Sequence, residues 1–175
     1  MNTIFLIIGE SGSGKDYLVN ILCDKYGYKK LKSYTTREPR YEGEDSHIFV
    51  YDAIFSNLDL CAYTSIHGNR YGATQEQVDE ADFYIIDPDG LNYMRDHYKG
   101  TKQLVPIYIK VSKFRRFCRM VKRGSTFKQA LERIREDKHR FESVKNFTGY
   151  VVKNVHKNKA LFEISKVIAN YSKWW

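Results

Sequence analysis

The stretch Ile4-Phe-Leu-Ile-Ile-Gly-Glu-Ser-Gly-Ser-Gly-Lys-Asp16 decides how the rest of this chain folds. Residues 4–8 are a short, mostly β-branched apolar run, which predicts a buried strand. Three glycines follow, and the apolar residues of 16–22 then recur at helical spacing. The amides of such a loop and the helix N-terminus form a concave nest of positive partial charge. Because Lys15 adds a full charge that can reach outer phosphates, the stretch predicts a nucleoside triphosphate site.

Asp16 stands where a phosphate loop usually has serine or threonine, whose hydroxyl holds Mg²⁺. An aspartate there could act on the ion directly or through water, or could simply favour the positive end of the helix. A plain glycine-rich turn is the alternative, but the spacing of the glycines, the lysine and the flanking elements favours phosphate binding. The predicted triphosphate-binding residues of the loop are Gly9, Ser11, Gly12, Ser13, Gly14, Lys15 and Asp16.

Length and composition predict one soluble domain. The chain has 175 residues, which is enough for a single core without staples. Its three cysteines, Cys23, Cys61 and Cys118, form no metal or redox motif, which predicts reduced thiols in a cytoplasmic protein. No apolar run is long enough to span a membrane. The net charge of +8 indicates anionic partners, either nucleic acid or small phosphorylated molecules.

A second anion site is predicted where residues 31–36, a candidate strand, run into a polar loop. Arg37 and Arg40 lie three apart beside serine and threonine hydroxyls. Pro39 excludes a helix interior and favours an extended loop. Guanidinium groups presented in this way are suited to bind a phosphate. A solvated polar loop is the alternative.

Residues 41–81 predict a small mixed sheet inserted into the main fold. Residues 47–51 and 60–66 are candidate strands, and Gly68-Asn69 is a tight-turn signal. The chain then returns to the core through an apolar run that ends in Asp87, followed by Asp89. A carboxylate at the end of a buried strand suits Mg²⁺ beside a phosphate loop. The two aspartates could equally be turn residues before Gly90.

The C-terminal half contains a dense basic region. Residues 104–111 predict a strand, and residues 112–123 and 126–143 predict two helices separated by Gly124. No acid occurs between Asp96 and Glu132, although basic residues crowd this region. Arg119 and Arg123 share one helical face, and Arg133 follows in the next helix. A solvated basic face or a nucleic-acid patch are the alternatives to a site for small anions. Residues 150–154 predict a last strand, and residues 157–171 a closing helix.

Strands that alternate with helices predict an α/β fold, with a parallel sheet, helices on both faces and ligands at the carboxyl ends of the strands. One triphosphate site, a second anion site and an arginine-rich helix pair describe a phosphotransferase that acts between two anions. A phosphate acceptor is a competent nucleophile at neutral pH, so no histidine or aspartate base is needed. Alignment and charge neutralisation are what the protein must supply.

Five blocks in order and spacing make nearly the whole chain resemble the guanylate kinases. They are residues 9–15, residues 33–40 (Ser-Tyr-Thr-Thr-Arg-Glu-Pro-Arg), residues 68–72 (Gly-Asn-Arg-Tyr-Gly), Arg119 with Arg123-Gly124, and residues 151–154. The resemblance implies one P-loop domain, 1–175, and ATP-dependent phosphorylation of a nucleoside monophosphate with Mg²⁺. It implies a core of 1–32, 82–112 and 144–175, an inserted small mixed-β acceptor-binding subdomain at 33–81, and a helical lid at 113–143.

The resemblance also implies a role for individual residues. Ser33, Arg37, Arg40 and Tyr71 would hold the acceptor phosphate, and His47 stands where the family has a tyrosine for the same task. Asp87 and Asp89 match the acidic pair near the acceptor and Mg²⁺. Asn154 would lie near the adenine of ATP. The residues that would act with Lys15 on the transferring phosphoryl group are the lid arginines Arg119, Arg123 and Arg133.

Two departures leave the acceptor open. Ala62 replaces the glutamate with which guanylate kinases read guanine, and Ala73 replaces the serine or threonine that also contacts it, although Thr74 is adjacent. A base edge is read by hydrogen bonds, so these changes weaken discrimination. Gly-Lys-Asp also resembles the ribose bisphosphate phosphokinases, whereas the Arg37 to Arg40 block does not. GMP or dGMP, giving the diphosphate, is the expected acceptor, and a ribose bisphosphate or another nucleoside monophosphate is the alternative.

Three other protein classes are disfavoured. A GTPase should carry an Asn-Lys-x-Asp motif, and Asn158-Lys-Ala-Leu161 lacks the aspartate. A non-catalytic guanylate kinase-like binding module should have lost the loop lysine and the lid arginines, which this chain keeps. A nucleic-acid binder needs exposed aromatics among its basic residues, and Phe114 and Phe117 fall at core-like spacing. Small-molecule nucleotides are therefore the expected partners.

Overall fold

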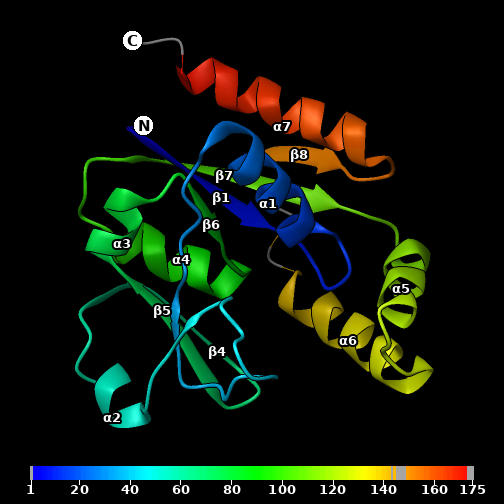
Figure 1. Ribbon diagram of the computed structural model, residues 1–175, viewed down its shortest axis with the longest axis horizontal. Helices are drawn as coiled ribbons and strands as arrows, with labels where there is room; N and C mark the ends of the chain where they lie inside the picture. Colours follow the sequence, from blue (N-terminus) through cyan, green and yellow to red (C-terminus); the bar gives the residue numbers. More distant parts are fainter. Residues whose placement is uncertain (1, 143, 145–148, 173–175) are drawn as a thin grey trace.

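A four-stranded parallel sheet forms the centre of the molecule (Figure 1). The computed structural model describes residues 2–142, 144 and 149–172. The strand order is β6-β1-β7-β8, with each neighbouring pair parallel. The strands are β1 (Thr3–Ile8), β6 (Phe83–Ile85), β7 (Gln103–Lys110) and β8 (Tyr150–Lys153). Because β1 is central and both of its faces are covered, all six of its residues are buried.

Helices cover both faces of this sheet, as the α/β pattern predicts. Phe5 and Ile7 point toward α1 (Lys15–Tyr26) and α7 (Lys157–Ser172), in one core cluster. Ile4, Leu6 and Ile8 point to the opposite face, where α4 (Pro88–His97) and the second sheet pack. Alternation of side chains along a strand divides one apolar run between two cores. The central position of β1 places the glycine loop that follows it at the carboxyl edge of the sheet.

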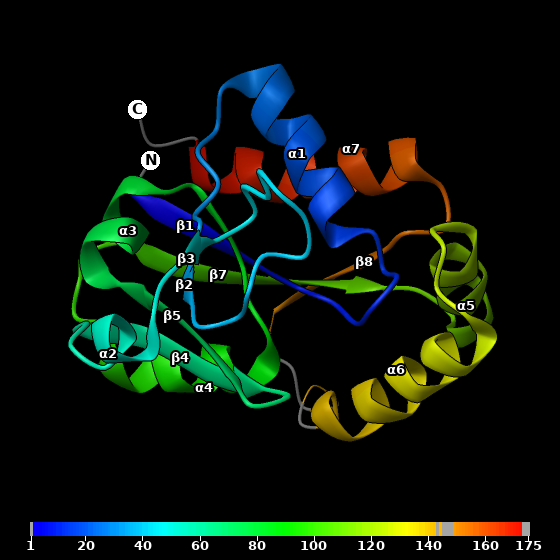
Figure 2. The same cartoon turned by 60° about the horizontal axis from the view of Figure 1, so that its bottom comes forward.

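A smaller mixed sheet, in the order β3-β2-β5-β4, lies beside the core (Figure 2). It contains β2 (Tyr34–Thr35), β3 (Ile48–Phe49), β4 (Leu60–Ile66) and β5 (Asn69–Thr74), with α2 (Asp52–Phe55) and α3 (Gln75–Glu80) attached. β2 pairs parallel with β3 and antiparallel with β5. The mixed sheet is therefore confirmed.

Two helices, α5 (Lys113–Lys122) and α6 (Phe127–Arg140), form a hairpin at the end of the molecule beside the glycine loop (Figures 1 and 2). Gly124, with φ of 94°, turns the chain between them. Thr126 begins α6 with a reciprocal capping box, since its hydroxyl accepts from the Gln129 amide while the Gln129 side chain accepts from the Thr126 amide.

Local details of the fold differ from the sequence predictions. The strand at 31–36 is only Tyr34–Thr35, and the tight turn falls at His67 and Gly68, one residue early, with φ of 51° and 77°. Two left-handed residues in a two-residue hairpin turn match the twist of the strands. Helix α4 was not predicted, because Asp-Pro-Asp-Gly reads as a turn. Pro88 takes the first helical position and Asp87 caps the helix.

Candidate active site

The glycine loop between β1 and α1 has the geometry of a phosphate loop. Gly12 and Gly14 have φ of 76° and 84°, and Gly14 is the N-cap of α1. A Cβ on Gly12 would lie 2.8 Å from the carbonyl oxygen of Arg116, so only glycine fits between the loop and α5. Lys15 begins α1, its side chain is 22% exposed, and its Nζ lies 3.9 Å from Asp16 Oδ2. A positive charge therefore stands beside the helix N-terminus.

One cavity of about 460 Å³ joins this loop to the second predicted anion site. Gly9, Ser11, Lys15 and Asp16 line it from the loop. Its lining from the second sheet and from α6 includes Ser33, Arg37, Arg40, His47, Tyr71, Arg133 and Arg140. Two groups of cationic donors that are far apart in the sequence thus face a shared space.

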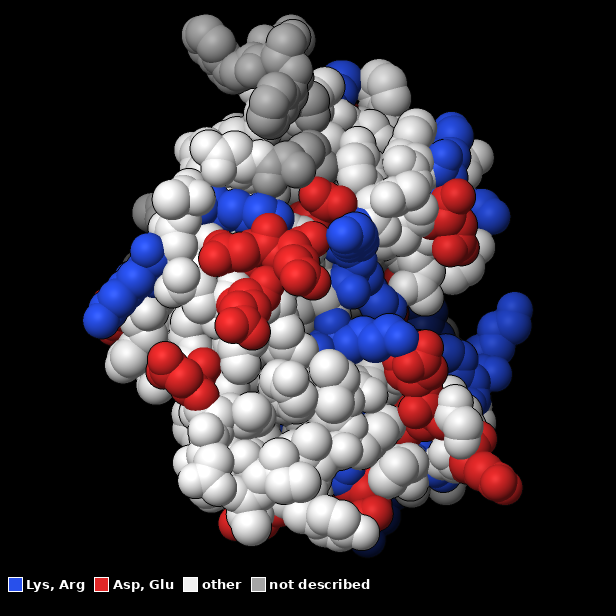
Figure 3. Space-filling model, turned by 60° about the vertical axis from the view of Figure 1, so that its left-hand side comes forward, with Lys and Arg blue, Asp and Glu red and all other residues white. Residues whose placement is uncertain are grey.

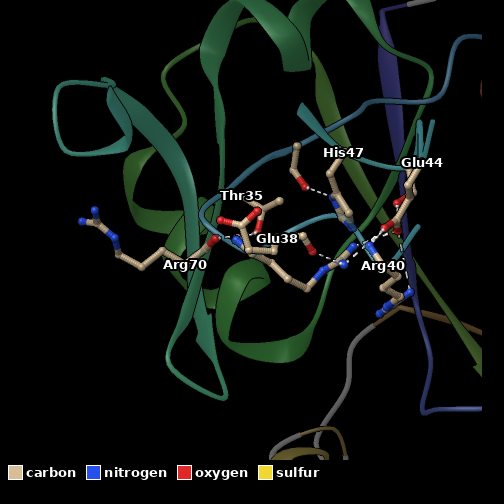
Figure 4. Close-up of polar contacts among 9 residues, drawn as sticks. Thr35, Glu38, Arg40, Glu44, His47 and Arg70 are labelled. Carbon is tan, nitrogen blue, oxygen red and sulfur yellow. Dashed lines mark hydrogen bonds and ion pairs between the residues drawn. The ribbon is translucent and has the colours of Figure 1, made fainter. Parts of the chain in front are cut away.

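The buried carboxylate of Glu44 organises the second predicted anion site (Figure 4). It accepts from both terminal nitrogens of Arg37, at 2.8 and 3.3 Å, from the amide of Arg40 at 2.7 Å and from the Ser46 hydroxyl at 2.6 Å. The Arg37 hydrogen bonds, then those from Arg40 and Ser46, lower the pKa of Glu44 to about 2. Sequence reasoning missed Glu44, which fixes the two arginines.

Donors remain available at this site for an anion. The Nε of Arg37 is buried and has no hydrogen-bond partner among the described residues. The Arg40 side chain is 70% exposed and lines the cavity. The Arg37 amide is held by Thr35 Oγ1 at 3.1 Å, which sets the loop at the end of β2 (Figure 4). Nη1 of Arg40 lies 3.9 Å from Glu44 Oε1. A phosphate would find a fixed guanidinium at Arg37 and an exposed one at Arg40.

His47 completes this side of the cavity as a neutral imidazole. Its Nδ1 lies 3.0 Å from Ser33 Oγ, and its ring centroid lies 5.5 Å from that of Tyr71. Burial, and then the nearby Arg37 charge, lower the pKa of His47. It can therefore exchange hydrogen bonds at neutral pH without adding positive charge.

The two aspartates predicted as site residues after β6 lie in different environments. Asp87 lines the cavity, and its carboxylate accepts from the Gly90 amide at 2.8 Å and the Thr64 hydroxyl at 2.9 Å. Burial raises its pKa, against these hydrogen bonds. Asp89 is exposed on the first turn of α4 and does not line the cavity. Asp87 is thus both a helix cap and a site residue, whereas Asp89 has the geometry of a helix-turn acid.

The three arginines predicted to act from the lid also lie in different environments. Arg133 lines the cavity, whereas Arg123 is exposed at the end of α5 and does not. Arg119 donates to the carbonyl oxygens of Ser13 at 3.0 Å and Asn154 at 3.0 Å, on the outer side of the phosphate loop. Burial and the charges of Arg115 and Arg123 lower the pKa of Arg119.

Further residues complete or depart from the predicted site. Arg140 lines the cavity although no motif marked it. Asn154 is 4% exposed and donates from Nδ2 to the Ser13 carbonyl at 2.8 Å, outside the cavity lining. Ala62 and Ala73 pair across β4 and β5 and are fully buried, and neither lines the cavity. The sequence does not specify how a helix is rotated about its own axis. It therefore could not show that Arg140 lines the cavity and Arg119 does not.

An acidic pair that sequence reasoning missed neutralises part of the basic region. Arg116, 1% exposed, donates to Glu10 Oε1 at 2.7 Å and to Asp137 Oδ2 at 2.5 Å. Arg116 is the buried arginine of the basic helix α5, and its charge is therefore balanced by one acid of the phosphate loop and one acid of α6. The acids lie 106 and 21 positions away, beyond the reach of local patterns.

The donor set fits Mg²⁺ carried by nucleotide phosphates. Among the described residues, no group of three or more His, Cys, Asp or Glu side chains could hold a metal ion by itself. Asp16, 67% exposed on the first turn of α1, and Asp87 both line the cavity. Mg²⁺ commonly takes one or two carboxylates together with substrate phosphates and waters.

Fold and site together define a P-loop α/β protein in which two groups of cationic side chains line one cavity. A family model described as guanylate kinase matches residues 1–171. The chain therefore belongs to the guanylate kinase family, as the sequence blocks predicted.

Curated relatives agree with this assignment over parts of their length. The guanylate kinase of Bordetella pertussis (strain Tohama I) is 36% identical over 85 residues, which cover 45% of this chain and 40% of that protein. That of Methylobacillus flagellatus is 39% identical over 85 residues, covering 45% and 42%. That of Alkalilimnicola ehrlichii is 28% identical over 144 residues, covering 75% and 70%. The matched segments thus span less than half the length of the first two.

A solved structure supports the fold. The crystal structure of guanylate kinase from Anaplasma phagocytophilum has a TM-score of 0.64 with this chain at 20% identity, covering 98% of this chain and 87% of that one. At this identity the likeness shows the fold, and the α/β P-loop architecture is confirmed. No helix within the described part of the chain has the length and apolar character needed to span a membrane.

Proposed function

We propose that this protein transfers a phosphoryl group from ATP to a nucleoside monophosphate, with GMP or dGMP as the first candidate acceptor. One observation carries the proposal: the phosphate loop with Lys15 and the second anion site with Arg37 and Arg40 line the same cavity. A transfer between two anions needs both phosphates in one enclosed space with cations around them. Membership of the guanylate kinase family supports the same reaction.

Three parts of one domain divide the work in this proposal. The core (1–32, 82–112 and 144–175) would hold ATP at the phosphate loop. The insert (33–81) would hold the acceptor through Ser33, Arg37, Arg40, His47 and Tyr71. The lid (113–143) would bring arginines to the transferring group. Arg133, which lines the cavity, is better placed for this than Arg119 or Arg123. The adenine contact of Asn154 remains a prediction.

The chemistry needs no protein base. An oxygen of the acceptor phosphate, ionised at neutral pH, attacks the γ-phosphorus of ATP. The bond between that phosphorus and the bridging oxygen breaks, so ADP leaves and the acceptor becomes a diphosphate. Lys15 and the cavity arginines neutralise the charge that spreads over the equatorial oxygens. Neutral His47 would orient the acceptor through hydrogen bonds rather than take a proton.

Asp16 and Asp87 would hold Mg²⁺ in this proposal, and the ion would neutralise charge on the β- and γ-phosphates when bound. Asp16 replaces the usual hydroxyl with a carboxylate at the cavity wall. Asp87 accepts hydrogen bonds at both oxygens, and a carboxylate has further acceptor sites for a water of the ion.

The base of the acceptor is the open part of the proposal. The buried Ala62 and Ala73 offer no hydrogen bond to a guanine edge. Thr64, Ile66 and Asn69 line the cavity from the same hairpin instead. We therefore expect a modest preference for GMP over other monophosphates. A sugar bisphosphate acceptor is the second candidate, favoured by Asp16, although Arg37 and Arg40 favour the nucleotide.

Nucleic acid and pure protein-binding roles receive less support. Figure 3 shows the side of the molecule away from α5, where Lys and Arg side chains lie among Asp and Glu side chains. On α5 itself, Arg116 is paired with Glu10 and Asp137, although Phe114, whose spacing predicted a core position, is 76% exposed. A non-catalytic binding module has no use for the loop lysine at the cavity wall. We also propose a cytoplasmic location, because Cys23, Cys61 and Cys118 are all free thiols.

A panel of acceptors tests the proposed function. The purified chain is incubated with ATP, Mg²⁺ and each of GMP, dGMP, AMP, dTMP, CMP and ribose 1,5-bisphosphate, and ADP and the phosphorylated products are separated by chromatography. We expect diphosphate from GMP with measurable turnover of at least one other monophosphate. Exclusive turnover of GMP would show that groups other than Ala62 and Ala73 read the base. A folded sample that consumes no ATP with any acceptor would contradict the proposal.

A further inference from the structure

Ser11, at the tip of the phosphate loop, has all three of its polar groups bound by lid side chains. Its amide donates to Asp137 Oδ2 at 2.9 Å, and its hydroxyl donates to Asp137 Oδ1 at 3.3 Å. Its carbonyl accepts from Arg116 Nε at 2.9 Å. We call Glu10, Ser11, Arg116 and Asp137 the lid clasp. The clasp ties both lid helices to one residue of the loop.

Arg116 and Asp137 of the clasp are buried, Glu10 is partly buried, and all three charges are paired. Each of the three nitrogens of the Arg116 guanidinium has an acceptor: the Ser11 carbonyl, Glu10 and Asp137. Glu10 also accepts from the Tyr108 hydroxyl at 2.8 Å, which anchors the clasp on β7. Replacement of a buried ion pair by apolar residues of similar volume is often neutral or stabilising, so the charges by themselves are weak evidence for added stability. What the charged pair adds is a fixed geometry between the lid and the loop.

The clasp also fixes the face that α6 turns toward the cavity. Arg133, Asp137 and Arg140 are spaced by four and three residues, so they share one helical face, and all three line the cavity. One residue earlier, Glu136 Oε2 lies 3.4 Å from Nε2 of His67 on the turn between β4 and β5. The end of α6 is therefore held by the loop on one side and by the insert on the other.

We propose that Asp137 and Arg116 are positioning residues: they dock the lid on the phosphate loop before nucleotide binds, and so place Arg133 and Arg140 over the phosphoryl group in transit. Arg133 and Arg140 would touch the phosphates, whereas the clasp acts through them and through Ser11. Arginines held in place need no reorganisation during the reaction. The kinetic part of this inference rests on the proposed function, and the docking of the free protein does not.

Amide hydrogen exchange of the nucleotide-free protein tests the docking. The wild type is compared with Asp137→Ala and with Glu132→Ala, a matched control that removes an exposed acid of α6 outside the cavity lining. We expect the Ser11 amide to exchange about tenfold faster in Asp137→Ala than in the other two. Arg116 keeps Glu10 as a partner, so Asp137→Ala should remain folded. Equal exchange in all three proteins would overturn the docking.

Steady-state kinetics test the positioning role. Asp137→Ala should lower kcat by about tenfold or more, with the acceptor KM within about twofold, because the acceptor contacts lie on other elements. Arg116→Met/Asp137→Ala should lose little beyond the single variant, since the two residues act as a unit. Arg115→Met removes the exposed neighbouring arginine of α5 and should leave kcat unchanged.

Two outcomes separate this inference from its alternatives. If Asp137→Ala lowers Tm but leaves kcat unchanged well below that temperature, the clasp is only structural and the positioning role is wrong. If the wild type phosphorylates no acceptor, the proposed function fails and the positioning role fails with it. The exchange experiment then still decides whether the clasp docks the lid.

Discussion

At the scale of a single residue, Glu44 fixes the side chains of the proposed acceptor site. It is the shared acceptor of Arg37, the Arg40 amide and Ser46. No motif marked it, because an acid in a Glu-Gly-Glu-Asp stretch reads as a solvated loop. The sequence could select Ser33, Arg37 and Arg40 because their types match phosphate chemistry, and all three line the cavity. The partner that orients them could only be found from contacts.

Glu44→Gln should make stability depend less on pH. The folded pKa of Glu44, about 2, lies below its ordinary value, so ionised Glu44 stabilises the fold above about pH 4.5. That contribution is lost as pH falls toward 2. The free energy of unfolding of Glu44→Gln should therefore lie below that of the wild type at pH 7, and the gap should shrink between pH 4.5 and 2. Urea titrations at several pH values measure it.

Glu42→Gln is the matched control for this prediction, because Glu42 is exposed two residues away. The free energy of unfolding of Glu42→Gln should stay close to that of the wild type at every pH. A gap for Glu44→Gln that is constant across the pH range would show that Glu44 does not titrate in this way.

Lys15→Ala should abolish phosphoryl transfer while leaving the fold intact. Lys15 is the cation of the loop that faces the cavity, and no other lysine of the loop can replace it. We expect kcat to fall by about three orders of magnitude or more, as removal of one preorganised charge at a transferring group can do. Circular dichroism and Tm should match the wild type. Retained turnover would remove Lys15 from the mechanism.

At the scale of secondary-structure elements, the contact between the phosphate loop and α5 fixes where the lid helix lies. Gly12 has a positive φ and lies against the backbone of Arg116, so the loop and the lid helix meet without a side chain between them. The helix hairpin itself was predicted from sequence, because Gly124 and the capping residues are local signals. Its rotation was not, since rotation depends on Arg116 meeting Glu10 and Asp137.

Gly12→Ala should displace α5 from the loop. The alanine would cost about 1–2 kcal/mol for its left-handed backbone and would also clash at 2.8 Å with the Arg116 carbonyl oxygen. Gly27→Ala is the control: Gly27 has φ of 71° and nothing within 4 Å of its added Cβ. Both variants should lose stability in thermal unfolding, Gly12→Ala more, and only Gly12→Ala should weaken ATP binding. Equal loss in both would contradict the close contact.

The shared cavity makes a prediction at the scale of the whole molecule. A single ligand that joins adenosine and guanosine through five phosphates should occupy both anion sites at once. Linking turns the second binding event into an intramolecular one, so this ligand should raise Tm more than ATP and GMP together, by about 5 °C or more at equal concentration. Differential scanning fluorimetry measures the shift.

Arg40→Ala provides the control for the linked ligand, because it removes one proposed contact to the acceptor phosphate and leaves the phosphate loop unchanged. Its Tm rise with the linked ligand should fall to that given by ATP alone. A linked ligand that never exceeds ATP in the wild type would mean that the two sites cannot be bridged.

The sequence by itself determined the order of strand, loop and helix, the family, and the residue types of both proposed anion sites. These features depend on chemistry within a dozen neighbouring residues, such as glycine conformations, helical spacing and the fixed order of the Ser-x-Thr-Thr-Arg-x-Pro-Arg block. Only the tertiary structure decided that Arg140 lines the cavity while Arg119 grips the loop from outside, and that Glu44 and Asp137 hold the cationic groups. Those outcomes depend on pairs as far apart as Ser11 and Asp137, 126 positions in the chain, whose meeting is fixed by the packing of elements and not by any local pattern.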